Sequence, residues 1–173
     1  MRPAQTQEYL DFARTRMGPL YRSACLLTGG DTHLAEDLVQ ETLGRMYVVW
    51  GRRRSKLGNP VAYAQTVLVR TFLTHRRRRS SGERPTAEPP EPPSQTAYTG
   101  DDASLRVTLL AVLERLSPMD RAVLVLRYWE DRSTEETAAA LGATAGAIRV
   151  RSLRALERLR AELGDQLPDL VQH

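Results

Sequence analysis

The sequence predicts an all-α fold in which two small helical domains are joined by a flexible linker. Apolar residues recur every three or four positions in both halves of the 173-residue chain, the spacing of helices that bury one face. No stretch of strand length alternates apolar and polar residues. Between residues 80 and 104, five of the ten prolines lie among Ser, Thr, Glu and Gly. Because proline donates no backbone hydrogen bond, we expect domains at 1–79 and 105–173 and a linker at 80–104.

The first half is expected to be helical throughout. Its first run covers residues 10–27, with an interruption expected near Gly18-Pro19, and Gly29-Gly30 closes it. Asp31 is the expected N-cap of a second helix, and Asn59-Pro60 begins a third as N-cap and first helical position. The expected core faces of the second and third helices are Leu34, Leu38, Thr42, Met46 and Val49, then Ala64, Val67, Leu68 and Phe72.

The second half begins with helical spacing from Leu105 to Leu116. The segment Ser117-Pro118-Met119-Asp120 then has the pattern of a helix start, with a capping serine, a proline first and an acid third. The buried stripe of this helix is expected to continue through Val123, Leu126 and Trp129.

Residues 131–163 have the pattern of a helix-turn-helix. Ser133 and Glu136 form a capping box for a short helix, Gly142 ends it, and Thr144 can cap a longer one. The buried side of the longer helix is expected to be Ile148, Ser152, Ala155, Leu156, Leu159 and Leu163. Five arginines and one glutamate lie between Thr144 and Arg160. Since arginine can bridge O6 and N7 of guanine, this pattern favours DNA binding over an ordinary helical hairpin.

Charge is distributed unevenly along the chain. The net charge is +4, but residues 51–80 carry nine basic side chains and no acidic one, whereas residues 31–50 are net acidic. A surface that binds a polyanion is therefore expected beside an acidic surface. The clustering of arginine favours nucleic acid over an acidic small molecule.

Composition disfavours several classes of protein. No window approaches the ~18 apolar residues of a membrane span, and residues 1–10 lack a signal-peptide core, so a cytoplasmic protein without membrane insertion is expected. One cysteine, Cys25, and three scattered histidines predict neither a disulfide nor a metal site, and no cofactor is expected. No catalytic triad, Cys/His pair or carboxylate pair converges, so an enzyme is not expected.

Six segments taken together resemble one protein family. They are Tyr21–Gly30 (YRSACLLTGG), Asp37–Thr42 (DLVQET), Asn59–Arg79, Leu113–Pro118, Leu124–Glu130 (LVLRYWE) and the helix-turn-helix at Ser133–Leu159. In this order they resemble the extracytoplasmic-function (ECF) sigma factors of bacterial RNA polymerase, of the actinobacterial type, over nearly the whole chain. The resemblance implies a subunit that directs promoter recognition, promoter melting and transcription initiation.

The resemblance divides these tasks between the domains. The first would correspond to sigma region 2, which binds core polymerase and the −10 element, and the second to region 4, which reads the −35 element. In the family, the helix with the DLVQET string docks on a coiled coil of the β′ subunit. The expected partners are therefore the β′ and β subunits of core RNA polymerase and promoter DNA, with polymerase contacts from Asp37, Leu38, Gln40 and Glu41.

The resemblance also implies two sets of DNA contacts. Those for the −10 element are Trp50, Arg52, Arg53, Lys56, Asn59, Tyr63, Thr66, Arg70, Arg76, Arg77 and Arg78. Those for the −35 element are Thr144, Arg149, Val150, Arg151, Leu153 and Arg154. Trp50 and Tyr63 could equally be core aromatics, and the sequence leaves this open. The run Arg76–Arg79 is expected to contact phosphate without reading sequence.

An anti-sigma factor is a further expected partner. The hypothesis is that it masks the surfaces of residues 31–50 and 133–163 while the linker lets it hold the domains away from their polymerase geometry. The competing interpretation is a stand-alone helix-turn-helix regulator, which leaves the DLVQET string and the basic third helix without a role. Binding to core polymerase distinguishes the two interpretations.

Overall fold

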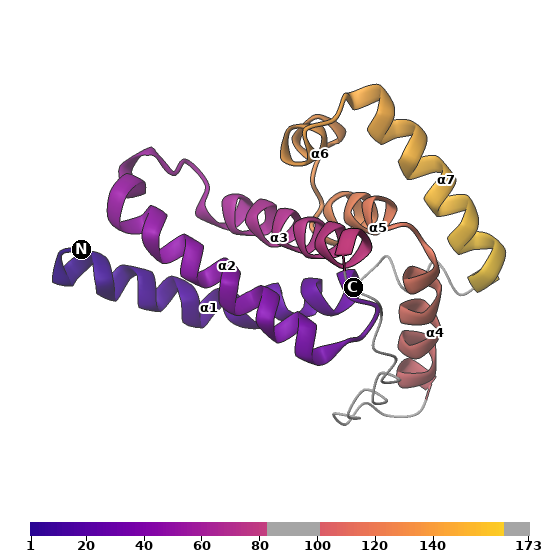
Figure 1. Cartoon of the computed structure of the whole chain (residues 1–173), viewed down its shortest axis with the longest axis horizontal. Helices are drawn as coiled ribbons and strands as arrows, with labels where there is room; N and C mark the ends of the chain where they lie inside the picture. Colours follow the sequence, from indigo (N-terminus) through magenta and orange to yellow (C-terminus); the bar gives the residue numbers. More distant parts are fainter. Residues whose placement is uncertain (83–100, 165–173) are drawn as a thin grey trace.

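The computed structural model describes residues 1–82 and 101–164, without the side chains of residues 101, 102 and 105. Within these ranges the chain contains helices and no strand, so the all-α prediction is confirmed. The elements, shown in Figure 1, are α1 (Pro3–Leu27), α2 (Thr32–Arg53), the 3₁₀ turn η1 (Arg54–Lys56), α3 (Pro60–Gly82), α4 (Asp101–Arg115), α5 (Pro118–Leu124), the π-helical turn η2 (Val125–Trp129), α6 (Thr134–Leu141) and α7 (Ala145–Leu163).

Both edges of the expected linker are helical, because α3 continues to Gly82 and α4 already begins at Asp101. The proline-rich part of the linker, residues 83–100, lies outside the described residues.

Five helices begin at the capping residues that the sequence predicts. The side chains of these residues accept a hydrogen bond from the backbone N–H three positions later, at 3.0–3.1 Å: Asp31, Asn59, Ser117, Ser133 and Thr144. At α6 the capping box is complete, because the backbone N–H of Ser133 donates to the Glu136 carboxylate at 2.8 Å. The predicted starts of these helices are confirmed.

Helix α1 runs through Pro19 without a break, so the predicted interruption is wrong. Proline inside a helix loses one hydrogen bond and crowds the preceding turn, at a cost of ~3 kcal/mol. The turns that follow bury Leu20, Ala24 and Leu27 almost completely. This burial offsets the cost of proline, which a local pattern does not reveal.

The two predicted domains pack against each other. Helix α3 lies beside α2 on one side and beside α5 and α6 on the other (Figure 1). Buried side chains of α1, α2 and α3 form one continuous apolar cluster with those of α4, α5 and α7. A smaller cluster of Val123, Ala138 and Ile148 holds the helix-turn-helix together.

The expected buried stripe after Ser117 is wrong at its last position. Val123 and Leu126 are buried, but Trp129 is 39% exposed. The cause is the π-turn η2, in which Glu130 N–H donates to the carbonyl of Val125, five residues back. This wider turn shifts the register of the following residues and turns Trp129 away from the core.

Candidate nucleic-acid interface

The acidic side of α2 is open to solvent. Asp37, Gln40 and Glu41 are exposed, and Glu41 forms an ion pair with Arg45 at 2.6 Å. Leu38, which was expected to contact the polymerase, is only 2% exposed and belongs to the core. Its packing anchors α2 from inside, so the three polar side chains form the surface available to a partner.

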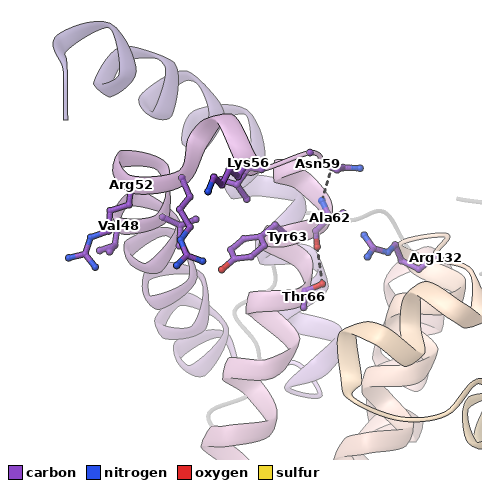
Figure 2. Close-up of a pocket in the computed structure, with 12 residues that line it drawn as sticks. Val48, Arg52, Lys56, Asn59, Ala62, Tyr63, Thr66 and Arg132 are labelled. Carbon is purple, nitrogen blue, oxygen red and sulfur yellow. Dashed lines mark hydrogen bonds between the residues drawn. The ribbon is translucent and has the colours of Figure 1, made fainter.

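A basic pocket of about 570 Å³ lies between the end of α2, η1 and the start of α3 (Figure 2). Its lining residues are Val48, Val49, Arg52, Arg53, Lys56, Leu57, Gly58, Asn59, Ala62, Tyr63, Thr66 and Arg132. Six of the residues expected at the −10 element therefore meet here: Arg52, Arg53, Lys56, Asn59, Tyr63 and Thr66. Cationic side chains around an aromatic ring suit an unstacked base together with its phosphate.

Trp50 and Tyr63 lie in different environments. The Trp50 ring is 2% exposed, and its centroid lies 4.8 Å from that of Phe12 and 5.7 Å from that of Tyr9. The guanidinium of Arg54 covers it at 4.7 Å. Trp50 is therefore a core aromatic with no face open for a base. Tyr63 is 39% exposed in the pocket, so its ring is available for stacking.

Arg70 does not point freely into solvent from α3. Its Nε donates to the carbonyl oxygen of Ala140 at 2.7 Å, and its Nη2 donates to that of Ala139 at 3.3 Å. Both acceptors lie at the end of α6. In this conformation the Arg70 guanidinium is therefore engaged by the other half of the chain and is not available for the expected −10 contact.

The arginines at the end of α3 differ in how deeply they are buried. Arg77 and Arg78 are exposed and available to phosphate, whereas Arg76 is half-buried. The charge of Arg76 acts on Arg121 of α5, whose pKa falls to about 10, first through burial and then through this repulsion.

The helix-turn-helix consists of α6, a turn at Gly142 and α7. Gly142 has φ of 64°, the left-handed conformation that glycine adopts without strain. On α7, Val150 is 48% exposed and Leu153 is 60% exposed, and Arg154 is also exposed. These side chains can therefore reach the major groove.

Three further residues of the expected −35 set already have partners. Arg149 forms an ion pair with Glu135 at 3.2 Å, and Arg151 forms one with Asp120 at 2.8 Å. The Thr144 hydroxyl is engaged in its cap. Arg151 thus ties α7 to the start of α5.

Several residues that line the pocket are absent from the DNA contacts that the sequence predicts. The apolar wall of the pocket consists of Val48, Val49 and Ala62. Each lies four positions, about one helical turn, before one of the predicted residues Arg52, Arg53 and Thr66, so this spacing could have identified them. Arg132 comes from the loop before α6, 66 positions after Thr66. Helical periodicity carries no signal for such a distant contact.

The part of the chain that the structure describes contains neither a membrane-spanning helix nor a cluster of metal-ligating side chains. There, no helix is long and apolar enough to cross a membrane, and no group of three His, Cys, Asp or Glu side chains could hold a metal ion. Cys25 is buried, and burial raises the pKa of its thiol, which disfavours the thiolate.

The helical core, the basic pocket and the helix-turn-helix define a two-part DNA-binding protein. Residues 14–82 match the family model "Sigma-70 region 2", and residues 112–161 match "Sigma-70, region 4". The chain belongs to the extracytoplasmic-function sigma factors, of the actinobacterial type, and directs promoter-specific transcription initiation. This family is not a family of enzymes.

Relatives from Streptomyces align with almost the full length of this chain. The chain is 43% identical over 157 residues to the RNA polymerase sigma-E factor of Streptomyces coelicolor, covering 90% of this chain and 86% of that protein. It is 38% identical over 164 residues to the sigma-E factor of Streptomyces avermitilis, covering 94% and 89%. The sigma factor RpoE of Bartonella quintana, solved in complex with the anti-sigma factor NepR, matches with a TM-score of 0.66 and 27% identity over 90% of this chain and 98% of that one.

Proposed function

We propose that this sigma factor docks on core RNA polymerase through the exposed side of α2 and captures the melted −10 element in the basic pocket. The observation that carries the proposal is the pocket itself, where an exposed Tyr63 ring is framed by Arg52, Arg53 and Lys56. An aromatic ring stacks on any base for about 1–3 kcal/mol, while the cations follow the strand. The binding energy for the melted strand shifts the duplex toward the open bubble without catalysis by this chain.

The polymerase surface consists of Asp37, Gln40 and Glu41. These side chains suit a basic helical partner, and we assign them to the coiled coil of the β′ subunit, with further contact to the β subunit. Leu38 acts indirectly, since it fixes the helix that presents them. The work of the protein then takes place in the cytoplasm, where polymerase and promoter DNA are.

The −35 surface is the exposed side of α7. Arg154 is assigned to base edges, and Val150 and Leu153 to apolar contacts such as thymine methyl groups. Arg77 and Arg78 at the end of α3 are assigned to phosphates, which set affinity without sequence preference.

An anti-sigma factor is the regulatory partner that we assign to this chain. The Bartonella relative was solved with one, and the match covers 90% of this chain and 98% of that protein. The surfaces to be masked are Asp31–Trp50 and Ser133–Leu163. Stoichiometric co-purification with the product of a neighbouring gene supports this assignment. Activity in the native host that deletion of that gene leaves unchanged counts against it.

The test is run-off transcription on genomic fragments with purified core polymerase, with and without the protein, followed by mapping of the 5′ ends. Discrete new start sites that share two upstream motifs are expected. The variant Tyr63→Ala should lose most of this transcription, whereas Tyr63→Phe, which keeps the ring, should retain it. Tight binding to duplex fragments with no effect on core polymerase would contradict the proposal and indicate a stand-alone regulator.

A further inference from the structure

The four cations of residues 52–56 have different surroundings. Three of them are exposed and line the basic pocket (Figure 2): Arg52, Arg53 and Lys56. The fourth, Arg54, is half-buried and is not part of the pocket lining. A cation that avoids the pocket in the middle of this basic segment needs a different explanation from its neighbours.

Arg54 contacts the first helix and the core instead. Its Nε and Nη2 lie 2.8 and 2.7 Å from one carboxylate oxygen of Glu8 on α1. Its guanidinium also lies over the Trp50 ring, 4.7 Å from the ring centroid. Arg54 opens the turn η1, so these two contacts attach the turn to α1 and to the end of α2.

Glu8 belongs to a part of α1 that packs against the end of α2 (Figure 1). Beside Glu8, the Tyr9 and Phe12 rings lie against Trp50, and the Tyr9 hydroxyl donates to the carbonyl oxygen of Leu43 on α2 at 2.7 Å. All three residues of α1 precede the match to sigma-70 region 2, which begins at residue 14. A rigid, aromatic support for η1 therefore comes from outside the matched range.

The turn η1 needs such support. Four positive charges within five residues repel one another, which opposes a compact turn. The turn is only three residues long, and the Leu57 N–H that closes it donates to the carbonyls of Arg53 and Arg54 at 3.2 Å each. Short 3₁₀ turns have weak hydrogen-bond geometry, so contacts outside the turn decide how its side chains are presented.

We propose that Glu8 and Arg54 are positioning residues, whose ion pair on the Trp50 ring holds η1 so that Arg53 and Lys56 face the melted strand. Neither Glu8 nor Arg54 touches DNA. This brace, the Glu8–Arg54 pair, rests on the proposed function, because it shapes the same pocket that captures the −10 element.

The first test uses the sign of an electrostatic effect. Glu8→Gln makes the chain one unit more positive, so electrostatics alone would tighten its binding to a polyanion. The brace predicts the opposite, a loss of about fivefold, as expected for breaking a partly exposed ion pair. The probe is a fluorescein-labelled oligothymidine strand of about 12 nucleotides, whose anisotropy is measured with the chain assembled on core polymerase.

The matched control is Asp11→Asn. It makes the same change of charge on the same helix, and it removes only exposed contacts with Gln7 and Arg14. This variant should bind the strand at least as tightly as the unaltered chain does. Equal or tighter binding by Glu8→Gln would overturn the brace.

A double-variant cycle separates positioning by Arg54 from direct contact with phosphate. Arg54→Gln should weaken binding about as much as Glu8→Gln, and the double variant should lose no more, because the pair acts as one unit. Both single variants should also change the salt slope of binding alike. Additive losses, with a slope lowered by about one in Arg54→Gln alone, would show a phosphate contact and overturn the positioning role.

Hydrogen exchange of the Leu57 amide tests the brace in the free chain, without DNA or polymerase. Glu8→Gln should speed this exchange, because η1 opens more often, whereas Asp11→Asn should leave it unchanged. Both substitutions replace an exposed carboxylate by an amide of the same shape, so both variants are expected to fold.

The outcomes distinguish the brace from the proposed function. Faster exchange in Glu8→Gln, from a chain that gives no start sites with core polymerase, would support the hold on η1 and refute the proposed function. Normal start sites, together with Leu57 exchange and strand binding that Glu8→Gln leaves unchanged, would refute the brace and support the proposed function.

Discussion

At the scale of single residues, Trp50 and Tyr63 show how burial separates side chains of similar chemistry. Both are aromatic and lie near the same basic loop, but only Trp50 packs against Phe12 and Tyr9. Periodicity along α2 does not show that Trp50 is buried, because Tyr47, Val48 and Val49 beside it offer other apolar faces. The distinction depends on α1, which crosses over Trp50 from far away in the sequence.

The first prediction contrasts these two residues. Trp50→Ala should lower the free energy of unfolding by about 3–5 kcal/mol, because it leaves a cavity in the core. Tyr63→Ala should change stability far less, yet weaken binding to a single-stranded −10 fragment by about 1–3 kcal/mol. Urea denaturation and fluorescence anisotropy measure the two quantities. Similar losses of stability from both substitutions would place Tyr63 in the core instead.

The second prediction concerns the capping box of α6. A hydrogen bond from the Ser133 backbone N–H lowers the pKa of the Glu136 carboxyl, with a smaller contribution from Arg132. A carboxyl with a depressed pKa stabilises the fold above its unfolded-state pKa, and this contribution is lost as pH falls through the folded-state pKa. Glu136→Ala should therefore cost more stability at neutral pH than in acid, as thermal unfolding at both pH values measures. An equal cost at both would show that the charged form is not what caps the helix.

At the scale of elements, helix starts were predictable and helix interiors were less so. A cap such as Asp31 or Ser133 acts within three residues, so its signal is local and complete in the sequence. The continuity of α1 through Pro19 and the π-turn at η2 depend on packing with other helices. Tertiary packing can outweigh a local preference. Apolar spacing alone therefore predicts that Trp129 is buried, although it is exposed.

The third prediction divides the arginines of α3 and α7 by role. Arg154→Ala should weaken −35 binding by about 1–3 kcal/mol at matching sequences and much less at others, because it removes a base contact. Arg78→Ala should weaken all promoters alike and reduce the salt slope of binding by about one. Competition binding over a range of salt concentrations checks both expectations.

Arg151→Ala is the control for that division. Its guanidinium is paired with Asp120, so the substitution should loosen α7 from α5 and lower stability without changing base preference. Equal losses across all sequences for Arg154→Ala and Arg78→Ala would contradict the assignment of these two roles.

At the scale of the whole molecule, the sequence predicts two helical units but not their contact. The pocket residues from α2, η1 and α3 follow one another within 19 positions, so a basic loop could be recognised from the sequence. The hydrogen bonds that Glu130, Arg70 and Arg121 form between the halves join residues 65 to 107 positions apart, and no local pattern encodes them. The family resemblance accordingly assigns Arg70 to DNA alone.

The last prediction tests whether the halves are one cooperative unit. Gly29, in the loop after α1, has φ of 65°, and a Cβ built on it would lie 3.0 Å from the Cβ of Glu114 on α4. Gly142 has φ of 64° and nothing within 4 Å of the same atom. Both Gly→Ala substitutions therefore impose the same left-handed strain, about 1 kcal/mol, but only Gly29→Ala also pushes α4 away from α1.

Gly29→Ala should therefore lower the free energy of unfolding in urea more than Gly142→Ala does. It alone should lengthen the distance between spin labels attached to α2 and α7. The excess cost measures the packing between the halves, because the backbone strain cancels between the two variants. If both variants cost the same and neither changes the label distance, α4 does not press on the loop after α1 in solution. In that case the contact between Gly29 and Glu114 contributes nothing to the packing of the two halves, and the apolar cluster shared by α1, α3 and α5 would hold them together without it.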